Sequence, residues 1–191
     1  GGQGHAPCDE FRHLLPGRKA RVPWERLLRM FAGQALAKDD YSLARPNKRY
    51  LDQDIVVPGL FSESLSLVVV SLDTSGSMDD ETIASGLAEI AKLHDLAPEI
   101  LLIVGDDDVH ETIETQNLPA YVKDLRVKGG GGTSHLPVFR YIERNRLTPD
   151  LFIGITDLES CFPSQPPRYP VLWLVPTEHD KAPWGRVIEI E

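Results

Sequence analysis

The chain has 191 residues, a length typical of one globular domain, and its 41% hydrophobic and 26% charged residues exclude an intrinsically disordered protein. Twenty basic and 29 acidic residues give a net charge of −9, the wrong sign for a protein that binds nucleic-acid phosphates. No apolar run approaches the roughly 20 residues that span a bilayer, and the first residues lack the apolar centre of a secretory signal. We therefore expect neither a nucleic-acid nor a membrane partner, and a cytoplasmic location.

The two ends of the sequence carry further expectations. The sequence does not begin with methionine, so we expect it to be a piece of a longer chain. Cys8 and Cys161 lie far apart without CxxC spacing; a disulfide between them stays open, but two reduced or buried thiols suit a cytoplasmic protein better. Residues 1–21 are polar and interrupted by proline and glycine, which predicts a flexible linker or arm.

Residues 22–60 are expected to form an N-terminal helix and an extended segment that pack on the main domain, residues 61–191. The helix is predicted from Pro23 onward, because Trp24, Leu28 and Ala35 recur at helical spacing. Pro46 argues against a regular helix in the segment that follows.

Beyond residue 60, short apolar runs alternate with amphipathic stretches. Residues 65–73 form a continuous run rich in β-branched side chains, typical of a strand buried on both faces. Asp79 or Asp80 can cap a following helix, and a second helix is predicted within 134–145. Further strands are predicted in the remaining apolar runs: 99–108, 109–115 (an edge strand or hairpin arm), 150–157, 169–175 and 186–190. The pattern indicates an α/β fold, a mostly parallel sheet of about six strands with 65–72 in the middle and helices on both faces.

Residues able to bind a cation follow the predicted strands. Asp73, Ser75 and Ser77 lie in a DTSGS turn directly after the first strand, Thr133 follows four glycines, and Asp157 ends the strand 150–157. Open α/β sheets bind ligands at the carboxyl ends of their strands, so these side chains are expected to converge. Carboxylate and hydroxyl oxygens suit Mg²⁺ or Mn²⁺, and Ca²⁺ differs only in cavity size and rigidity.

These residues resemble the metal-ion-dependent adhesion site of von Willebrand factor type A (VWA) domains. Beyond the site, DYSLARPNKRY (40–50), DTSGSM (73–78), GGTSHLPVF (131–139) and PVLWLV (170–175) are similar to a bacterial VWA-like domain that follows a metallopeptidase-like domain (DUF2201). The resemblance covers about residues 22–191 and implies a Rossmann-like three-layer sandwich. No HExxH motif occurs, so hydrolysis by a peptidase half is not expected of this chain.

The resemblance implies roles for particular residues. Ser75, Ser77 and Thr133 would coordinate the cation directly, and Asp73 and Asp157 directly or through water. The rim would be formed by four further residues: Asp106, Ser134, His135 and Glu159. One departure is the loop after Asp157, which reads LES where a glycine is expected next.

Less specific readings apply to parts of this set. The aspartates 106–108 are read first as a solvated strand end, and the histidines as surface or packing residues. The glycine run lacks the GK[ST] ending of a nucleotide-binding loop.

The leading hypothesis is a metal-dependent protein-binding module, not an enzyme, whose cation accepts an aspartate or glutamate from a protein partner. The resemblance further implies work with an AAA+ ATPase in a chaperone-like or assembly role. Two alternatives stay open: a phosphohydrolase or nuclease that uses Asp73, Asp106 and Asp157 around Mg²⁺, and a metal-free VWA scaffold.

Overall fold

The computed structural model describes residues 23–37, 66–74, 78–125 and 134–190, and within them six strands form one sheet. The strands are β1 (Leu67–Asp73), β2 (Glu99–Gly105), β3 (Val109–Glu114), β4 (Leu151–Ile155), β5 (Val171–Val175) and β6 (Arg186–Glu189). Their order is β3-β2-β1-β4-β5-β6. β3 is antiparallel to β2 and every other neighbouring pair is parallel, which confirms the predicted α/β fold and the hairpin arm.

The strand β1 lies in the middle of the sheet, between β2 and β4, as its sequence predicts. All seven of its residues are buried. A strand covered on both faces has no solvent-facing side, and the apolar residues Leu67–Val70 and Leu72 fill both faces of β1.

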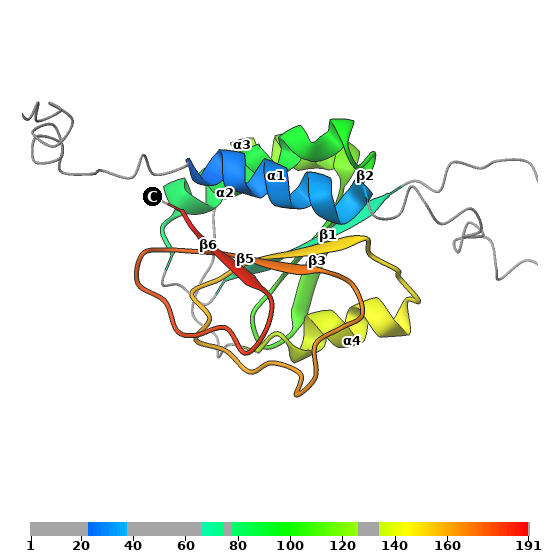
Figure 1. The fold of residues 1–191 in the computed structure, drawn as a ribbon, viewed down its shortest axis with the longest axis vertical. Coiled ribbons are helices and arrows are strands. Elements are labelled where there is room, and N and C mark those ends of the chain that lie inside the picture. The colour runs from blue at the N-terminus through cyan, green and yellow to red at the C-terminus, as the bar shows by residue number, and fades with distance from the viewer. Residues whose placement is uncertain (1–22, 38–65, 75–77, 126–133, 191) are drawn as a thin grey trace, which may run out of the picture.

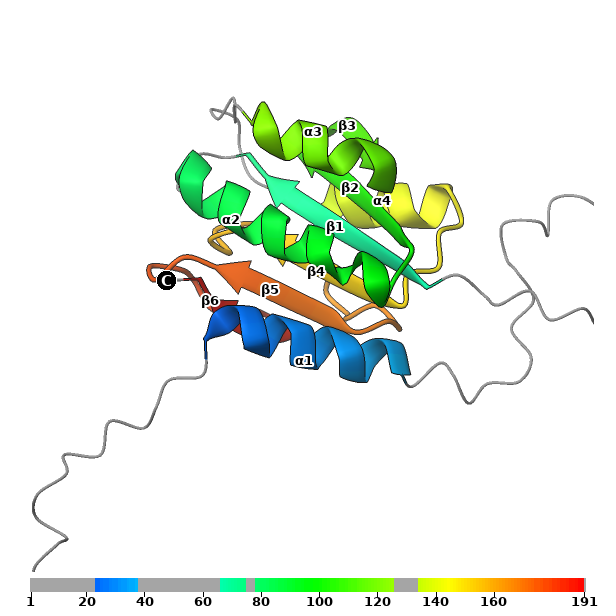
Figure 2. The same ribbon diagram turned by 90° about the horizontal axis from the view of Figure 1, so that it is seen from above.

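Helices cover both faces of the sheet. They are α1 (Trp24–Ala37), α2 (Asp80–Ala91), α3 (Leu118–Lys123) and α4 (Leu136–Arg144), with short 3₁₀ turns η3 (Lys92–Asp95) and η4 (Thr115–Asn117). The helices α1, α2 and α3 lie on one face, and α4 lies on the other (Figures 1 and 2). No helix in the described ranges is long and apolar enough to cross a membrane.

Local sequence explains where these helices begin. The carboxylate of Asp79 accepts a hydrogen bond from the backbone N–H of Thr82 at 2.6 Å, which caps α2 as predicted. This backbone hydrogen bond lowers the pKa of Asp79. Pro23 precedes α1 directly, and its carbonyl accepts from the N–H groups of Arg26 and Leu27. Leu28, on the buried side of α1, joins the same core as the sheet.

Aromatic side chains fill much of the α4 face. The ring of Trp173 on β5 passes directly over Gly154 on β4, where a Cβ atom would lie 2.3 Å from it. Trp173 is fully buried and its indole N–H donates to the carbonyl of Trp184 at 2.8 Å. The chain runs from β4 to β5, and from β5 to β6, without a helix in the described residues, so Phe162 and Trp184 of these loops pack on Trp173, and Phe139 of α4 packs on Trp184 beside them.

Part of the predicted organisation lies outside the described residues: the arm 1–21, the segment 38–60 and Cys8. Cys161 carries a free thiol and is exposed, not buried.

Candidate metal centre

The buried polar side chains of the described residues gather at one edge of the sheet. They are Ser71, Asp73, Thr74, His135, Thr156 and Asp157, each no more than 7% exposed. All but His135 lie at the carboxyl ends of the neighbouring strands β1 and β4, and His135 precedes α4 directly. Buried polar groups cost free energy unless they are paired, so such a concentration marks this edge as the candidate site.

Asp73 and Asp157 reach this edge from adjacent strands. Thr156 directly precedes Asp157, and its hydroxyl donates to Oδ2 of Asp73 at 2.9 Å. The same hydroxyl oxygen accepts from the N–H of Leu158 at 3.1 Å, and Oδ1 of Asp157 accepts from the N–H of Glu159 at 3.0 Å. The two carboxylates are thus held by the strand ends and by the first residues of one loop.

Leu158 occupies the position where the family pattern predicts glycine. Its φ is 68°, the left-handed conformation that glycine adopts without strain, and its side chain is 2% exposed. It packs in the apolar cluster with Val138 and Phe139 of α4. The turn therefore has the backbone form expected of a glycine, although the residue is leucine.

Asp106 belongs to a tight turn after β2. Gly105 is paired with Asp73 across the sheet, and a Cβ on it would lie 2.2 Å from the carbonyl oxygen of Asp108. Oδ1 of Asp106 accepts from the backbone N–H of Asp107 at 2.6 Å and from Nε2 of His110 at 2.8 Å. Burial raises the pKa of Asp106, but these hydrogen bonds outweigh it and leave the pKa below its ordinary value.

The other aspartates of this turn face water. Asp107 and Asp108 are exposed, and Asp108 accepts from the N–H of Val109 at 2.8 Å. The hydrogen bond to Asp106 and its negative charge raise the pKa of Asp107. Asp107 and Asp108 therefore fit the prediction of a solvated strand end, whereas the side chain of Asp106 is only 12% exposed.

Ser134 and His135 lie between the loops that follow β2 and β4. The N–H of Ser134 donates to the carbonyl of Asp106 at 3.3 Å, and the N–H of His135 donates to the carbonyl of Cys161 at 2.9 Å. Ser134 and Cys161 form an isolated parallel bridge. The residues directly after Thr133 are therefore fixed against both loops.

The imidazole of His135 is 2% exposed and packs among aromatic rings. It stacks on Phe162 at a centroid distance of 4.9 Å and meets Trp173 edge-on at 5.2 Å. Nδ1 lies 2.6 Å from the hydroxyl oxygen of Ser160, whereas Nε2 has no hydrogen-bond partner among the described residues. Burial lowers the pKa of His135 to about 4, against the opposing charge of Asp157, so the ring is neutral at pH 7.

The described residues bring most of the predicted set to one edge: Asp73, Asp106, Ser134, His135, Asp157 and Glu159. Ser75, Ser77 and Thr133 lie outside the described residues. Sequence reasoning missed the roles of Thr156 and Ser160, whose hydroxyls hold Asp73 and His135. The position of Thr156, directly before Asp157 at the strand end, was a signal that could have identified it. No sequence signal connects Ser160 with His135, which lies 25 positions earlier.

The donor set fits a hard divalent cation in part. Asp73 and Asp157 are buried carboxylates at neighbouring strand ends. Among the described residues, no three His, Cys, Asp or Glu side chains are close enough to hold an ion together. A cation here therefore requires the hydroxyls expected of residues 75, 77 and 133.

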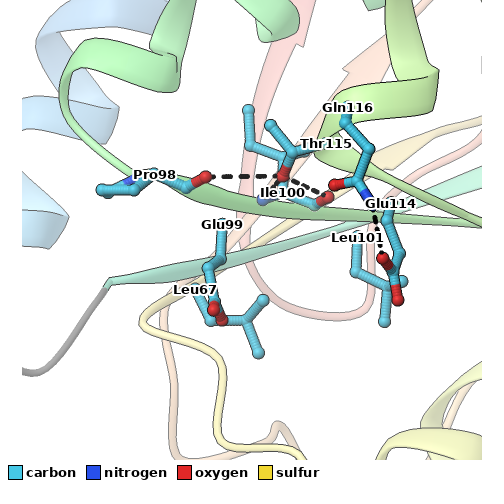
Figure 3. A pocket seen from close by; sticks show the side chains of 8 residues that line it. All are labelled: Leu67, Pro98, Glu99, Ile100, Leu101, Glu114, Thr115 and Gln116. Carbon is cyan, nitrogen blue, oxygen red and sulfur yellow. Dashed lines mark hydrogen bonds between the residues drawn. The ribbon is translucent and has the colours of Figure 1, made fainter.

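A cleft of 290 Å³ lies at the opposite edge, where β1 and β2 begin (Figure 3). Its polar groups are engaged with one another. The hydroxyl of Thr115 bridges the N–H and carbonyl of Ile100, and Gln116 donates to Glu114 at 2.9 Å. The cleft is separate from the candidate metal centre.

Comparison with known proteins gives two similarities. A family model for the VWA-like domain (DUF2201) matches residues 68–191. An uncharacterized protein of Thermotoga maritima is 34% identical over 124 residues, which are 64% of this chain and 30% of that protein. The chain thus matches less than a third of that relative's length.

Proposed function

Because the chain belongs to the family of VWA-like domains (DUF2201), we propose that it is a metal-dependent protein-binding module. A divalent cation, Mg²⁺ in the first instance with Mn²⁺ or Ca²⁺ as alternatives, would be held by five residues: Asp73, Ser75, Ser77, Thr133 and Asp157. The cation would accept an aspartate or glutamate side chain from a protein partner.

One observation carries the proposal. Asp73 and Asp157 are buried at the ends of adjacent strands, and Thr156, which precedes Asp157, donates its hydroxyl to Asp73 at 2.9 Å. Two buried carboxylates at one edge of a sheet favour a positive ion near them. The neutral hydroxyls expected beside them add no charge, so the ion keeps its affinity for one more anionic oxygen.

The enzymatic alternative has less support. It requires Asp106 beside Asp73 and Asp157 at the metal, and the carboxylate of Asp106 is engaged by His110 and Asp107. All three aspartates lie within the described residues, where no three such side chains form a metal-holding group. A nuclease or phosphohydrolase would therefore need a different set of ligands.

The wider role is also a proposal. Work with an AAA+ ATPase in a chaperone-like or assembly role is supported by the resemblance to bacterial VWA proteins. We also propose a cytoplasmic location for this work.

Calorimetric titration of the chain with MgCl₂ and with MnCl₂ tests the cation site. We expect one ion per chain, and a loss of binding of about 100-fold or more in Asp73→Asn, whose amide keeps an acceptor for Thr156 but loses the charge. Asp95→Asn is the matched control, because Asp95 is exposed and pairs with Arg29 far from the site. Equal affinity in Asp73→Asn would refute the assignment, and no binding to the unaltered chain would favour the metal-free scaffold. Phosphatase or phosphodiesterase turnover lost in Asp106→Asn would favour the enzyme.

A further inference from the structure

His135 makes three contacts with three consecutive residues of the loop after β4. Its N–H donates to the carbonyl of Cys161 at 2.9 Å, its Nδ1 lies 2.6 Å from the hydroxyl of Ser160, and its ring stacks on Phe162. Contacts of three kinds, backbone, polar and aromatic, therefore join one residue to one short segment.

These contacts connect the two sides of the candidate centre. The loop that contains Ser160 and Cys161 begins at Asp157, and Thr133 lies two residues before His135. Mg²⁺ demands near-ideal octahedral geometry, so the separation of ligands on different loops decides how tightly it binds. Residues behind metal ligands commonly control affinity in this way, by fixing the ligands' positions.

Packing alone does not account for an imidazole here. A phenyl ring would stack on Phe162 and meet Trp173 equally well, and it would bury no polar atom. The imidazole instead buries Nε2, for which the part of the chain that the structure describes offers no hydrogen-bond partner, and such burial costs free energy. What the imidazole adds over a phenyl ring is the contact of Nδ1 with Ser160.

We propose that His135 is a positioning residue of the cation site, which through Ser160 and Cys161 holds the loop after Asp157 against Ser134 and His135, the residues that follow Thr133 in the sequence. The inference rests on the proposed function, since it concerns the same cation. The added claim is that cation affinity depends on His135, although His135 is not itself a ligand of the cation.

Four variants separate positioning from packing: His135→Phe, Ser160→Ala, the double variant, and His135→Asn, whose side-chain amide can replace Nδ1. Mn²⁺ affinity is measured by calorimetry, and the melting temperature and the exchange rate of the residue 135 amide are measured in EDTA. We expect His135→Phe to melt at the same temperature or higher, because the buried unpaired nitrogen is gone, yet to bind Mn²⁺ about tenfold more weakly. Its residue 135 amide should exchange about tenfold faster without metal.

Ser160→Ala should weaken Mn²⁺ binding equally, and the double variant should be no weaker than either single one, because all three remove one contact. His135→Asn should recover most of the affinity despite poorer stacking. His94→Phe is the control, since His94 is exposed on η3 and should leave both readouts unchanged.

The outcomes distinguish the two proposals. If the unaltered chain binds no Mn²⁺, the proposed function fails and this inference fails with it. If the unaltered chain binds Mn²⁺ and both His135→Phe and Ser160→Ala bind it as tightly, the positioning role alone is refuted. An affinity that simply follows melting temperature across the variants would also refute it.

Discussion

Replacing Leu158 by alanine and by glycine tests how the turn beside Asp157 is held. Leu158 combines a φ of 68° with 2% exposure, so its backbone is strained while its side chain is buried. Both substitutions remove a buried leucine, which costs about 2–5 kcal/mol of unfolding free energy. The two variants differ only in the Cβ methyl group and in the backbone conformations that it restricts, which makes their difference informative.

The expected order is the reverse of the usual one. A residue with a Cβ in the left-handed region lowers the free energy of unfolding by about 1–2 kcal/mol, and alanine at position 158 keeps this loss. Glycine removes it but loses about 0.5–1 kcal/mol through its greater freedom in the unfolded chain. Leu158→Gly should therefore be more stable than Leu158→Ala by about 0.8 kcal/mol, the middle of the range of about 0–1.5 kcal/mol that these two terms allow.

Urea unfolding in EDTA measures both variants. Glu189→Ala and Glu189→Gly are the matched control pair, because Glu189 is exposed in the extended backbone of β6. There glycine should be the less stable by about 0.5–1 kcal/mol. If Leu158→Gly falls below Leu158→Ala by the same margin as at residue 189, the left-handed turn does not exist in solution.

Three further predictions follow from the described contacts. Gly154→Ala forces a Cβ to within 2.3 Å of the buried Trp173 ring and should lower the free energy of unfolding by about 1–3 kcal/mol. In Gly33→Ala, on α1, the new Cβ meets nothing within 4 Å, and the free energy of unfolding should rise by about 0.5–1 kcal/mol. Thermal unfolding compares the two variants. Asp73→Asn in EDTA should unfold at nearly the same urea concentration as the unaltered chain, because the acceptor for Thr156 remains; a large loss would show a structural rather than a metal-binding role. The pKa of Asp79 is lowered in the folded state, so the stability that its carboxylate adds is fully present above the unfolded pKa of about 3.9. That stability is lost as the pH falls through the folded pKa. Asp79→Ser keeps an uncharged cap on α2 and should flatten this part of an acid-unfolding curve.

The strands were predictable because their burial leaves a direct trace in the sequence. β1 is buried at all seven positions and apolar at all but Ser71 and Asp73, whereas the mostly polar and exposed run Val109–Glu114 is typical of an edge strand. The helix α3 leaves no such trace. It has six residues, too few to display a helical period, and its formation depends on packing against α2.

The candidate site was predictable in its carboxylates but not in its supporting contacts. Asp73 and Asp157 end apolar runs, and the parallel sheet brings such ends together. The contact of His135 with Ser160 joins residues far apart in the sequence and depends on the path of a loop without regular structure. The left-handed backbone at Leu158 is likewise hidden, because burial of its side chain supports a conformation that the residue itself disfavours.

The charge around the candidate site bears on how a partner would be recognised. Asp107, Asp108 and Glu159 are exposed on the loops at this edge, in a chain of net charge −9. A partner carboxylate that approached without a cation would meet like charge from these residues and from Asp73 and Asp157 behind them. A bound divalent ion attracts the partner carboxylate, so the electrostatic interaction at the point of contact changes from repulsion to attraction. We therefore expect the partner to bind only when the cation is present. Added salt should reduce the repulsion from the exposed loops more than it weakens the desolvated contact at the metal.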